Sequence, residues 1–184
     1  MRGLSRRRLI KLGYLVITLL LTAIIVRAFP AKDPGSALSS SDALAVVEVF
    51  DGDTISVQRN GVVEKVRFIG IDTPETKDPR KPVQCFGKEA SQYTKGLLEG
   101  KRVRLEIDST QGERDRYDRI LAYVRREDGL FVNQQLVAEG YAHEYTYQDQ
   151  EYAYQAEFRA AEEVARNEQK GLWSPNTCNG DTSS

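Results

Sequence analysis

The stretch that most constrains the fold of this chain is residues 66–76, VRFIGIDTPET. It begins as an apolar strand and ends in a polar loop, and it carries Arg67, Asp72 and Glu75. An arginine inside an apolar strand must reach solvent with its charged end or pair with a carboxylate. The stretch therefore predicts a strand whose end holds a charged site, and the rest of the chain must supply its partners.

Charge is distributed unevenly along the 184 residues. Of the 26 Lys/Arg and 27 Asp/Glu residues, seven and two lie in residues 1–42, a net charge of +5. The other 19 and 25 give residues 43–184 a net charge of −6. Bulk positive charge is the usual basis of non-specific nucleic-acid binding, and residues 43–184 lack it. Any phosphate chemistry must depend on a few placed cations or on a bound metal.

The N-terminus has the pattern of a targeting segment. Five basic residues lie within residues 2–11, and residues 12–26 carry no charge. This apolar run is short for a membrane span and typical of a signal sequence, either an ordinary one or a twin-arginine one. We expect residues 1–28 to be a signal peptide or a retained signal anchor, which leaves the domain secreted, periplasmic or membrane-anchored outside the cytoplasm. Residues 29–42, rich in Pro, Gly, Ser and Ala, are expected to form a flexible linker.

Residues 43–176 are expected to form one domain, followed by a polar, frayed tail at 177–184. Turn signals at 51–53 and 59–61 predict that the first three strands form an antiparallel meander. Helical spacing and closing glycines predict three helices, and Trp173 is expected to attach the end of the domain to the core. The expected strands are 43–49, 54–58, 62–71, 101–107 and 120–124, and the expected helices are 86–97, 131–139 and 150–168. This order indicates an α+β fold, which is either a small partly open five-stranded barrel of the OB type or another α+β fold.

Two carboxylates lie at the ends of strands that should be neighbours, Asp53 and Asp72. Together with a backbone carbonyl and water, they would make a hard-oxygen site suited to Ca²⁺. The alternative is structural, because Asp51 and Asp53 are common turn residues and Asp72 could cap the bend before Pro74.

Two arginines admit the same pair of interpretations. Arg67 could form an ordinary ion pair with Glu64 or Glu106, or it could bind a phosphate through its planar guanidinium. Arg119 directly precedes an apolar strand, so it could point into a cleft or be a solvated charge of the 111–119 turn.

Four motifs resemble the thermonuclease (staphylococcal nuclease-like) family: DGDT at 51–54, RFIGIDTPET at 67–76, DRYDRILAY at 115–123 and GLWS at 171–174. They occur in the family's order and cover about residues 43–174. The resemblance implies an OB barrel with three helices. It also implies a Ca²⁺-dependent endonuclease that hydrolyses phosphodiester bonds in DNA and RNA, with little sequence specificity, and leaves 3′-phosphate ends.

The resemblance also implies a role for each site residue. Asp53, Asp72 and the carbonyl of Thr73 match calcium ligands, Glu75 matches the proposed general base, and Arg67 and Arg119 match the arginines that bind the scissile phosphate. Tyr117 and Tyr145 match tyrosines of the nucleotide pocket, and Arg116 is expected beside them. Lys77, Arg80 and Lys81 match a basic loop that steers the substrate.

The sequence departs from the family pattern at two places. Asp118 stands where glycine is common, and its charge could weaken phosphate binding or pair with Arg116. The segment near Tyr145 is one residue shorter, so Tyr147 is the alternative for that role. The lone histidine, His143, is expected to be a packing or surface residue.

Cys85 and Cys178 would be buried thiols in a cytosolic protein and a disulfide behind an export signal. For an exported domain we expect a disulfide between the first helix and the C-terminal tail. The competing functional hypothesis is a non-catalytic OB-fold module that binds nucleic acid or acts as an adaptor. The joint presence of Arg67, Glu75 and Arg119 favours the enzyme. We expect a monomer, with nucleic acid as substrate and with membrane contact if the N-terminal segment is retained.

Overall fold

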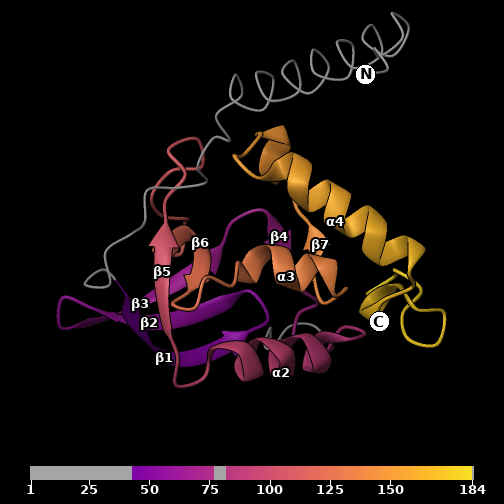
Figure 1. Ribbon diagram of the computed structural model, residues 1–184, viewed down its shortest axis with the longest axis horizontal. Helices are drawn as coiled ribbons and strands as arrows, with labels where there is room; N and C mark the ends of the chain where they lie inside the picture. Colours follow the sequence, from indigo (N-terminus) through magenta and orange to yellow (C-terminus); the bar gives the residue numbers. More distant parts are fainter. Residues whose placement is uncertain (1–42, 77–81, 184) are drawn as a thin grey trace, which may run out of the picture. The chain divides into compact units, whose positions relative to one another are not determined.

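The computed structural model describes residues 43–76 and 82–183, which all belong to the same structural unit (Figure 1). The expected targeting segment at 1–28, the linker at 29–42 and the basic residues Lys77, Arg80 and Lys81 lie outside these ranges. Among the helices within these ranges, none combines the length and apolar character needed to cross a bilayer.

Five strands form a closed barrel in the order β1-β2-β3-β6-β5. They are β1 (Leu44–Asp51), β2 (Thr54–Arg59), β3 (Val62–Phe68), β5 (Arg102–Glu106) and β6 (Ile120–Arg126). The antiparallel meander of β1, β2 and β3 is confirmed. Antiparallel pairing of β1 with β5 closes the barrel, which the sequence pattern left partly open. The last two pairs are β5 with β6, which are antiparallel, and β3 with β6, which are parallel with Val66 opposite Ile120.

The strand expected at 62–71 breaks near its end, at Gly70. This residue has a φ of +76°, and a Cβ there would lie 2.5 Å from the ring of Tyr152, so glycine meets both requirements. A single strand would place Ile69 and Ile71 on the face opposite Val66 and Phe68. Because the chain turns at Gly70, all four side chains are buried. The chain continues as β4 (Ile71–Asp72), which pairs with β7 (His143–Glu144) outside the barrel.

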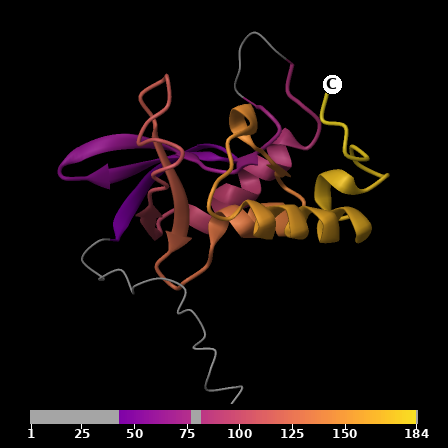
Figure 2. The same cartoon turned by 90° about the horizontal axis from the view of Figure 1, so that it is seen from above.

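Three helices of the described residues lie toward one side of the barrel in both views (Figures 1 and 2). The helix α2 (Gly87–Leu98) packs on β1, and α3 (Val132–Ala138) packs on β6 and on α4 (Gln155–Asn167). The expected stripe on α4 is confirmed, since Phe158 and Ala165 are buried. This helix begins at Gln155 rather than at residue 150, because Tyr152 is buried and donates its hydroxyl to the carbonyl of Gly70 (3.1 Å).

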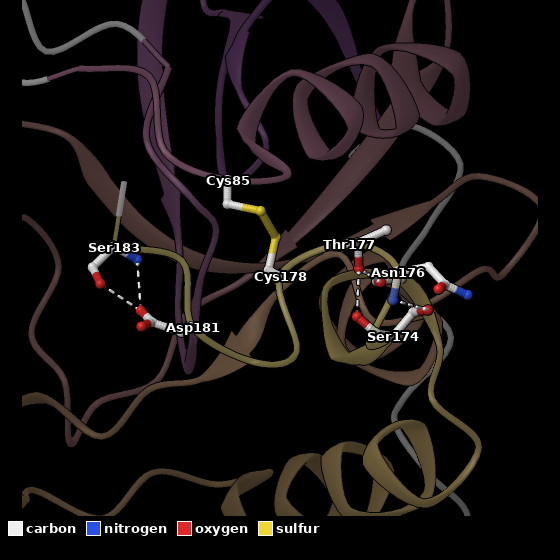
Figure 3. Close-up of a disulfide and its surroundings, with 8 residues drawn as sticks. Cys85, Ser174, Asn176, Thr177, Cys178, Asp181 and Ser183 are labelled. Atoms are coloured by element: carbon white, nitrogen blue, oxygen red, sulfur yellow. Dashed lines mark hydrogen bonds between the residues drawn. A yellow bond between two sulfur atoms is a disulfide. The ribbon is translucent and has the colours of Figure 1, made fainter.

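The C-terminal segment is held to the domain, although the sequence indicated a frayed tail. Leu172, in the 3₁₀ turn η3 (Gly171–Trp173), is fully buried and its N–H donates to the carbonyl of Gly140 (2.9 Å). Leu172, rather than the partly exposed Trp173, therefore attaches this segment to the core. Farther on, the expected disulfide joins Cys178 to Cys85, two residues before α2 (Figure 3).

A buried carboxylate, Asp108, joins the end of β5 to the start of α4. It accepts hydrogen bonds from the hydroxyl of Tyr123 (2.7 Å), from the backbone N–H of Ala153 (2.9 Å) and from both the N–H and the hydroxyl of Thr110 (2.9 and 2.7 Å). Burial raises the pKa of Asp108, but these donors outweigh it and hold the pKa below its ordinary value. The charged form therefore stabilises the fold.

Removal of the disulfide by Cys85→Ser with Cys178→Ser should lower the free energy of unfolding by on the order of 4 kcal/mol, because a long loop is no longer closed in the unfolded chain. Urea denaturation of the oxidised protein and of the double variant measures the difference. Reduced wild type is the matched control and should unfold with the double variant. Coincident curves for oxidised wild type and the variant would show that the bridge adds no stability.

Asp108→Asn should lower the free energy of unfolding at pH 7 by about 1–3 kcal/mol, since a neutral amide replaces a carboxylate that serves four donors. The folded-state pKa is depressed, so this contribution is complete above the unfolded pKa of about 4 and is lost as the pH falls through the folded pKa. Urea denaturation at pH 7 and pH 3 should show the variant and the wild type converging at low pH. The exposed Asp149→Asn serves as control, with a change within about 0.5 kcal/mol at either pH. A pH-independent difference for Asp108→Asn would contradict the assignment.

Candidate active site

The turn between β1 and β2 fits closely against the loop that follows β4. A Cβ on Gly52 would lie 2.7 Å from the side chain of Thr73, so only glycine allows this approach. Asp53 is buried and accepts hydrogen bonds at Oδ2 from the N–H and the hydroxyl of Thr73 (both 3.0 Å). From the other side, Thr94 of α2 donates its hydroxyl to the carbonyl of Gly52 (2.7 Å). The two predicted metal-ligand segments are therefore in direct contact.

Arg67 lies between the two carboxylates that the sequence proposed as ligands. Its Nη1 forms an ion pair with Oδ2 of Asp53, and its Nη2 lies 2.6 Å from Oδ1 of Asp72. Neither expected partner is used, because Glu64 and Glu106 pair with other arginines on the barrel surface. Asp53 is next to Arg67 because β2 pairs with β3 with Thr54 opposite Arg67. The bend at Gly70 brings Asp72 back to the same guanidinium.

The guanidinium of Arg67 is buried, and this lowers its pKa. The adjacent carboxylate of Asp72 opposes that effect, whereas the nearby charge of Arg119 adds to it. The two arginines are neighbours because Val66 of β3 pairs with Ile120 of β6, the residue directly after Arg119. Parallel pairing of the two strands therefore places two guanidinium groups at one end of the barrel.

A second pair of acidic groups, Asp51 and Glu75, lies beside this arrangement. Burial and a side-chain hydrogen bond with Glu75 raise the pKa of Asp51 to about 6. The N–H of Thr76 donates to Oε1 of Glu75 (2.9 Å), and the hydroxyl of Thr76 donates to Oδ1 of Asp51 (3.1 Å). Glu75 is thus held against the β1–β2 turn, next to the Asp53 side of the site.

Arg119 is fixed by a carboxylate that sequence reasoning did not single out, Asp115. Oδ2 of Asp115 lies 2.6 Å from both Nε and Nη2 of Arg119. Its Oδ1 accepts from the N–H groups of Tyr117 (2.9 Å) and Arg119 (3.0 Å). Burial raises the pKa of Asp115, but the bonds from Arg119 and Tyr117 outweigh it and lower the pKa overall. The i,i+4 spacing of an aspartate and an arginine in DRYDR was the sequence signal for this pair.

The unusual Asp118 lies in the same turn with a φ of +63°, a conformation that glycine adopts freely and aspartate tolerates. Its carboxylate lies 3.6 Å from Nη1 of Arg114 and is largely exposed. Of the two possibilities for Asp118, pairing with Arg116 is not observed, because its ion-pair partner is Arg114.

One pocket of about 430 Å³ brings many of the predicted residues together. Predicted residues in its wall are Arg67, Asp72, Arg116, Tyr117, Arg119, Tyr145 and Tyr147. Asp53, Thr73 and Glu75 are not in the wall. Asp53 forms an ion pair with Arg67, which lines the pocket, and Thr73 donates hydrogen bonds to Asp53. Glu75 is hydrogen-bonded to Asp51. Arg67 thus lines the pocket and also contacts the carboxylates of Asp53 and Asp72.

Three tyrosine rings border the pocket while remaining open to solvent. Tyr117, Tyr145 and Tyr147 are 63%, 44% and 50% exposed, which is enough for a flat ligand to stack on them. The guanidinium of Arg116 lies 4.9 Å from the ring of Tyr117. His143 pairs in β7 with Asp72 and packs edge-on against Trp173, with ring centroids 4.8 Å apart, as a packing residue would.

The donor set was tested for its fit to a divalent cation. Within residues 43–76 and 82–183, no group of three or more His, Cys, Asp or Glu side chains converges to bind a metal by side chains alone. Asp53 and Asp72 nevertheless offer hard oxygen donors in adjacent positions. Two carboxylates, Asp53 and Asp72, pair with the guanidinium of Arg67, and a second acidic pair, Asp51 and Glu75, lies beside them, where burial and the hydrogen bond with Glu75 raise the pKa of Asp51. The residues therefore fit a hard cation in ligand type and in charge.

The fold is a closed OB barrel that carries, at one end, two neighbouring arginines held by carboxylates. Such a barrel and site are those of a nuclease, and the chain's relatives agree. Residues 65–175 match the model of the family described as Staphylococcal nuclease homologue. The chain belongs to this family and is a nuclease, a hydrolase of phosphodiester bonds.

Curated relatives support the same assignment. The chain is 42% identical to the thermonuclease of Staphylococcus hyicus over 79% of its own length and 83% of the relative's. It is 37% identical to the thermonuclease of Staphylococcus intermedius, over 88% and 95% of the two chains. It is also 40% identical to the endonuclease YncB of Bacillus subtilis, over 68% of its own length and 58% of that protein.

Asp115→Asn should lower the free energy of unfolding by about 1–3 kcal/mol, because Arg119 loses a charged acceptor and the turn loses its carboxylate. Urea denaturation at pH 7 measures the change. Asp118→Asn is the matched control in the same turn, and its exposed ion pair should contribute less than about 1 kcal/mol. Equal effects of the two substitutions would show that Asp115 does not hold the turn.

Proposed function

We propose that this nuclease is a calcium-dependent, extracytoplasmic enzyme that cleaves DNA and RNA with little sequence specificity and leaves 3′-phosphate ends. The observation that supports this proposal best is the convergence of Arg67, Arg119 and Asp72 in the wall of one pocket, although they come from three separate segments of the chain. A nucleic acid presents a phosphate anion, and this pocket offers two cations beside a group of oxygen donors.

The arginines are proposed to bind the scissile phosphate. A phosphodiester repels an attacking hydroxide, and its charge increases in the five-coordinate transition state. Two guanidinium groups already held in place stabilise that charge without reorganising during the reaction. Asp53 and Asp72 fix Arg67 and Asp115 fixes Arg119, so the orientation of both cations is set before substrate arrives.

Glu75 is proposed as the general base. A carboxylate within one hydrogen bond of the attacking water takes its proton as the oxygen–phosphorus bond forms, and the bond to the 5′ oxygen then breaks. The 5′ oxygen leaves and takes a proton from solvent water, Glu75 returns its proton to solvent, and the phosphate stays on the 3′ oxygen, which gives the proposed product ends. This role is supported by the hydrogen bond of Glu75 with Asp51, which belongs to the same β1–β2 turn as Asp53.

Asp53, Asp72 and the carbonyl of Thr73 are the residues that would hold Ca²⁺. When bound, the ion would supply positive charge that polarises the phosphate and assists ionisation of water. The excess of carboxylates over arginines in this cluster supports a cation requirement. Metal binding should also raise the melting temperature, since a ligand that binds the folded state stabilises it.

The exposed tyrosines are proposed to carry the bases on either side of the cleaved bond. Tyr117 and Tyr145 can stack on any base, because stacking uses the face of the ring and does not read its hydrogen-bonding edge. Arg116 would add charge beside Tyr117. This mode of binding supports low sequence specificity on both DNA and RNA.

Export is proposed from the N-terminal pattern and from the disulfide. Structural disulfides persist in oxidising compartments, so Cys85–Cys178 is consistent with a domain outside the cytoplasm. Residues 1–28 would direct export or remain as a membrane anchor, residues 29–42 would link that segment to the domain, and the folded domain would act as a monomer.

Glu75→Gln and Arg67→Ala test the proposal with single-stranded DNA and RNA in Ca²⁺ or in EGTA. Loss of the base should lower kcat by about 10²–10⁴-fold, and loss of one phosphate donor should lower it by about 10²–10³-fold. Arg59→Ala, an exposed arginine at the β2–β3 hairpin, is the control and should retain wild-type activity. EGTA should abolish cleavage and the Ca²⁺-dependent rise in melting temperature, and Asp53→Asn should abolish the same rise. Equal cleavage by wild type and both site variants would refute the assigned roles.

A further inference from the structure

The segment that carries Glu75 is held by a residue outside the pocket, Gln84. The N–H of Glu75 donates to Oε1 of Gln84 (2.7 Å), and the N–H of Gln84 donates to the carbonyl of Glu75 (3.0 Å). The two residues are nine positions apart. Gln84 therefore satisfies both backbone groups of Glu75, one with its side chain and the other with its own main chain.

The start of α2 provides the surface on which this segment rests. A Cβ on Gly87 would lie 2.9 Å from the methyl of Thr76 and 3.1 Å from the carbonyl oxygens of Pro74 and Glu75, so the loop approaches the helix backbone closely. Phe86 precedes the helix with a φ of +66° and packs its ring against Tyr141, with centroids 5.4 Å apart. Any displacement of residues 84–87 would therefore be transmitted to Glu75.

The disulfide fixes the same segment from the other side. Cys85 directly follows Gln84, and its bond to Cys178 joins it to the C-terminal segment (Figure 3). That segment is itself secured, because Leu172 is buried and the N–H of Gly180 donates to its carbonyl (2.9 Å). A covalent connection thus runs from the C-terminal segment to the residue that holds Glu75.

We propose that Gln84 is a positioning residue for Glu75, and that the Cys85–Cys178 disulfide maintains this position by fixing the residue next to it. The inference rests on the proposed role of Glu75 as the base. A general base must lie within hydrogen-bond reach of the water it deprotonates, and a displacement of about 1 Å can cost on the order of 10²-fold in rate. Gln84 contacts the backbone of Glu75 and not the pocket, so it should affect turnover more than substrate binding.

Gln84→Ala should lower kcat by about tenfold or more and change KM by less than about twofold, because it removes the acceptor of the Glu75 N–H. Gln84→Glu retains that acceptor oxygen and should recover most of the loss. Gln92→Ala, an exposed glutamine on α2, controls for a general effect of the substitution and should leave kcat unchanged. All assays are made in Ca²⁺ well below the melting temperature of each variant.

A double-mutant cycle separates positioning from stability. If Gln84 acts through Glu75, Gln84→Ala should add no further loss to Glu75→Gln. The Cys85→Ser, Cys178→Ser pair should likewise lower kcat in the wild-type background and not in the Glu75→Gln background. This pattern of interdependence is the expected result, and a merely structural contribution would not produce it.

Three outcomes overturn the inference, and they identify where it fails. If Glu75→Gln retains full activity, the proposed base is wrong and the inference falls with it. If Glu75→Gln is impaired but the Gln84→Ala loss multiplies with it, the proposed function stands and positioning through Glu75 is refuted. If the disulfide variant keeps the wild-type kcat while Gln84→Ala does not, the role assigned to the disulfide is refuted.

Discussion

The ion pairs of Arg67 with Asp53 and Asp72 are the interaction on which the rest of the site depends. A buried guanidinium is costly unless carboxylates and good geometry compensate for its lost hydration. Here Asp53 comes from the β1–β2 turn and Asp72 from β4, so satisfying one charge fixes two separate backbone segments. Gly52 and Gly70 make this possible, because each allows an approach of chain segments that a side chain would prevent.

The same principle recurs at the neighbouring Arg119 in the pocket wall. Asp115 binds its guanidinium and two backbone N–H groups at once, so one carboxylate organises both the turn and the cation. Both arginines are therefore held by acidic groups before any phosphate arrives. Acidic residues outnumber basic ones in residues 43–184, and three of them, Asp53, Asp72 and Asp115, hold the two pocket arginines in place.

Local features of the sequence predicted much of the fold. Alternating strands and turn pairs such as Asn60-Gly61 predicted the meander, and helical spacing predicted the buried stripe through Phe158. The motifs also named the residues that meet at the pocket. The partners predicted for Arg67 were wrong, because its contact with Asp72 depends on the bend at Gly70, where the backbone packs closely against the ring of Tyr152. Leu172 was missed in favour of Trp173 because burial follows from position, and the larger ring lies outside, against His143.

The parallel pairing of β3 with β6 has a consequence for when the enzyme can act. These strands are distant in the sequence, and this pairing brings Arg67 and Arg119 together. Contacts between distant segments form only once the intervening chain has been ordered, so they are slow to form. Formation of the β3–β6 seam and assembly of the pocket are thus the same event. An unfolded chain carries all of these side chains and yet does not bring the two arginines together, so the pocket exists only in the folded protein.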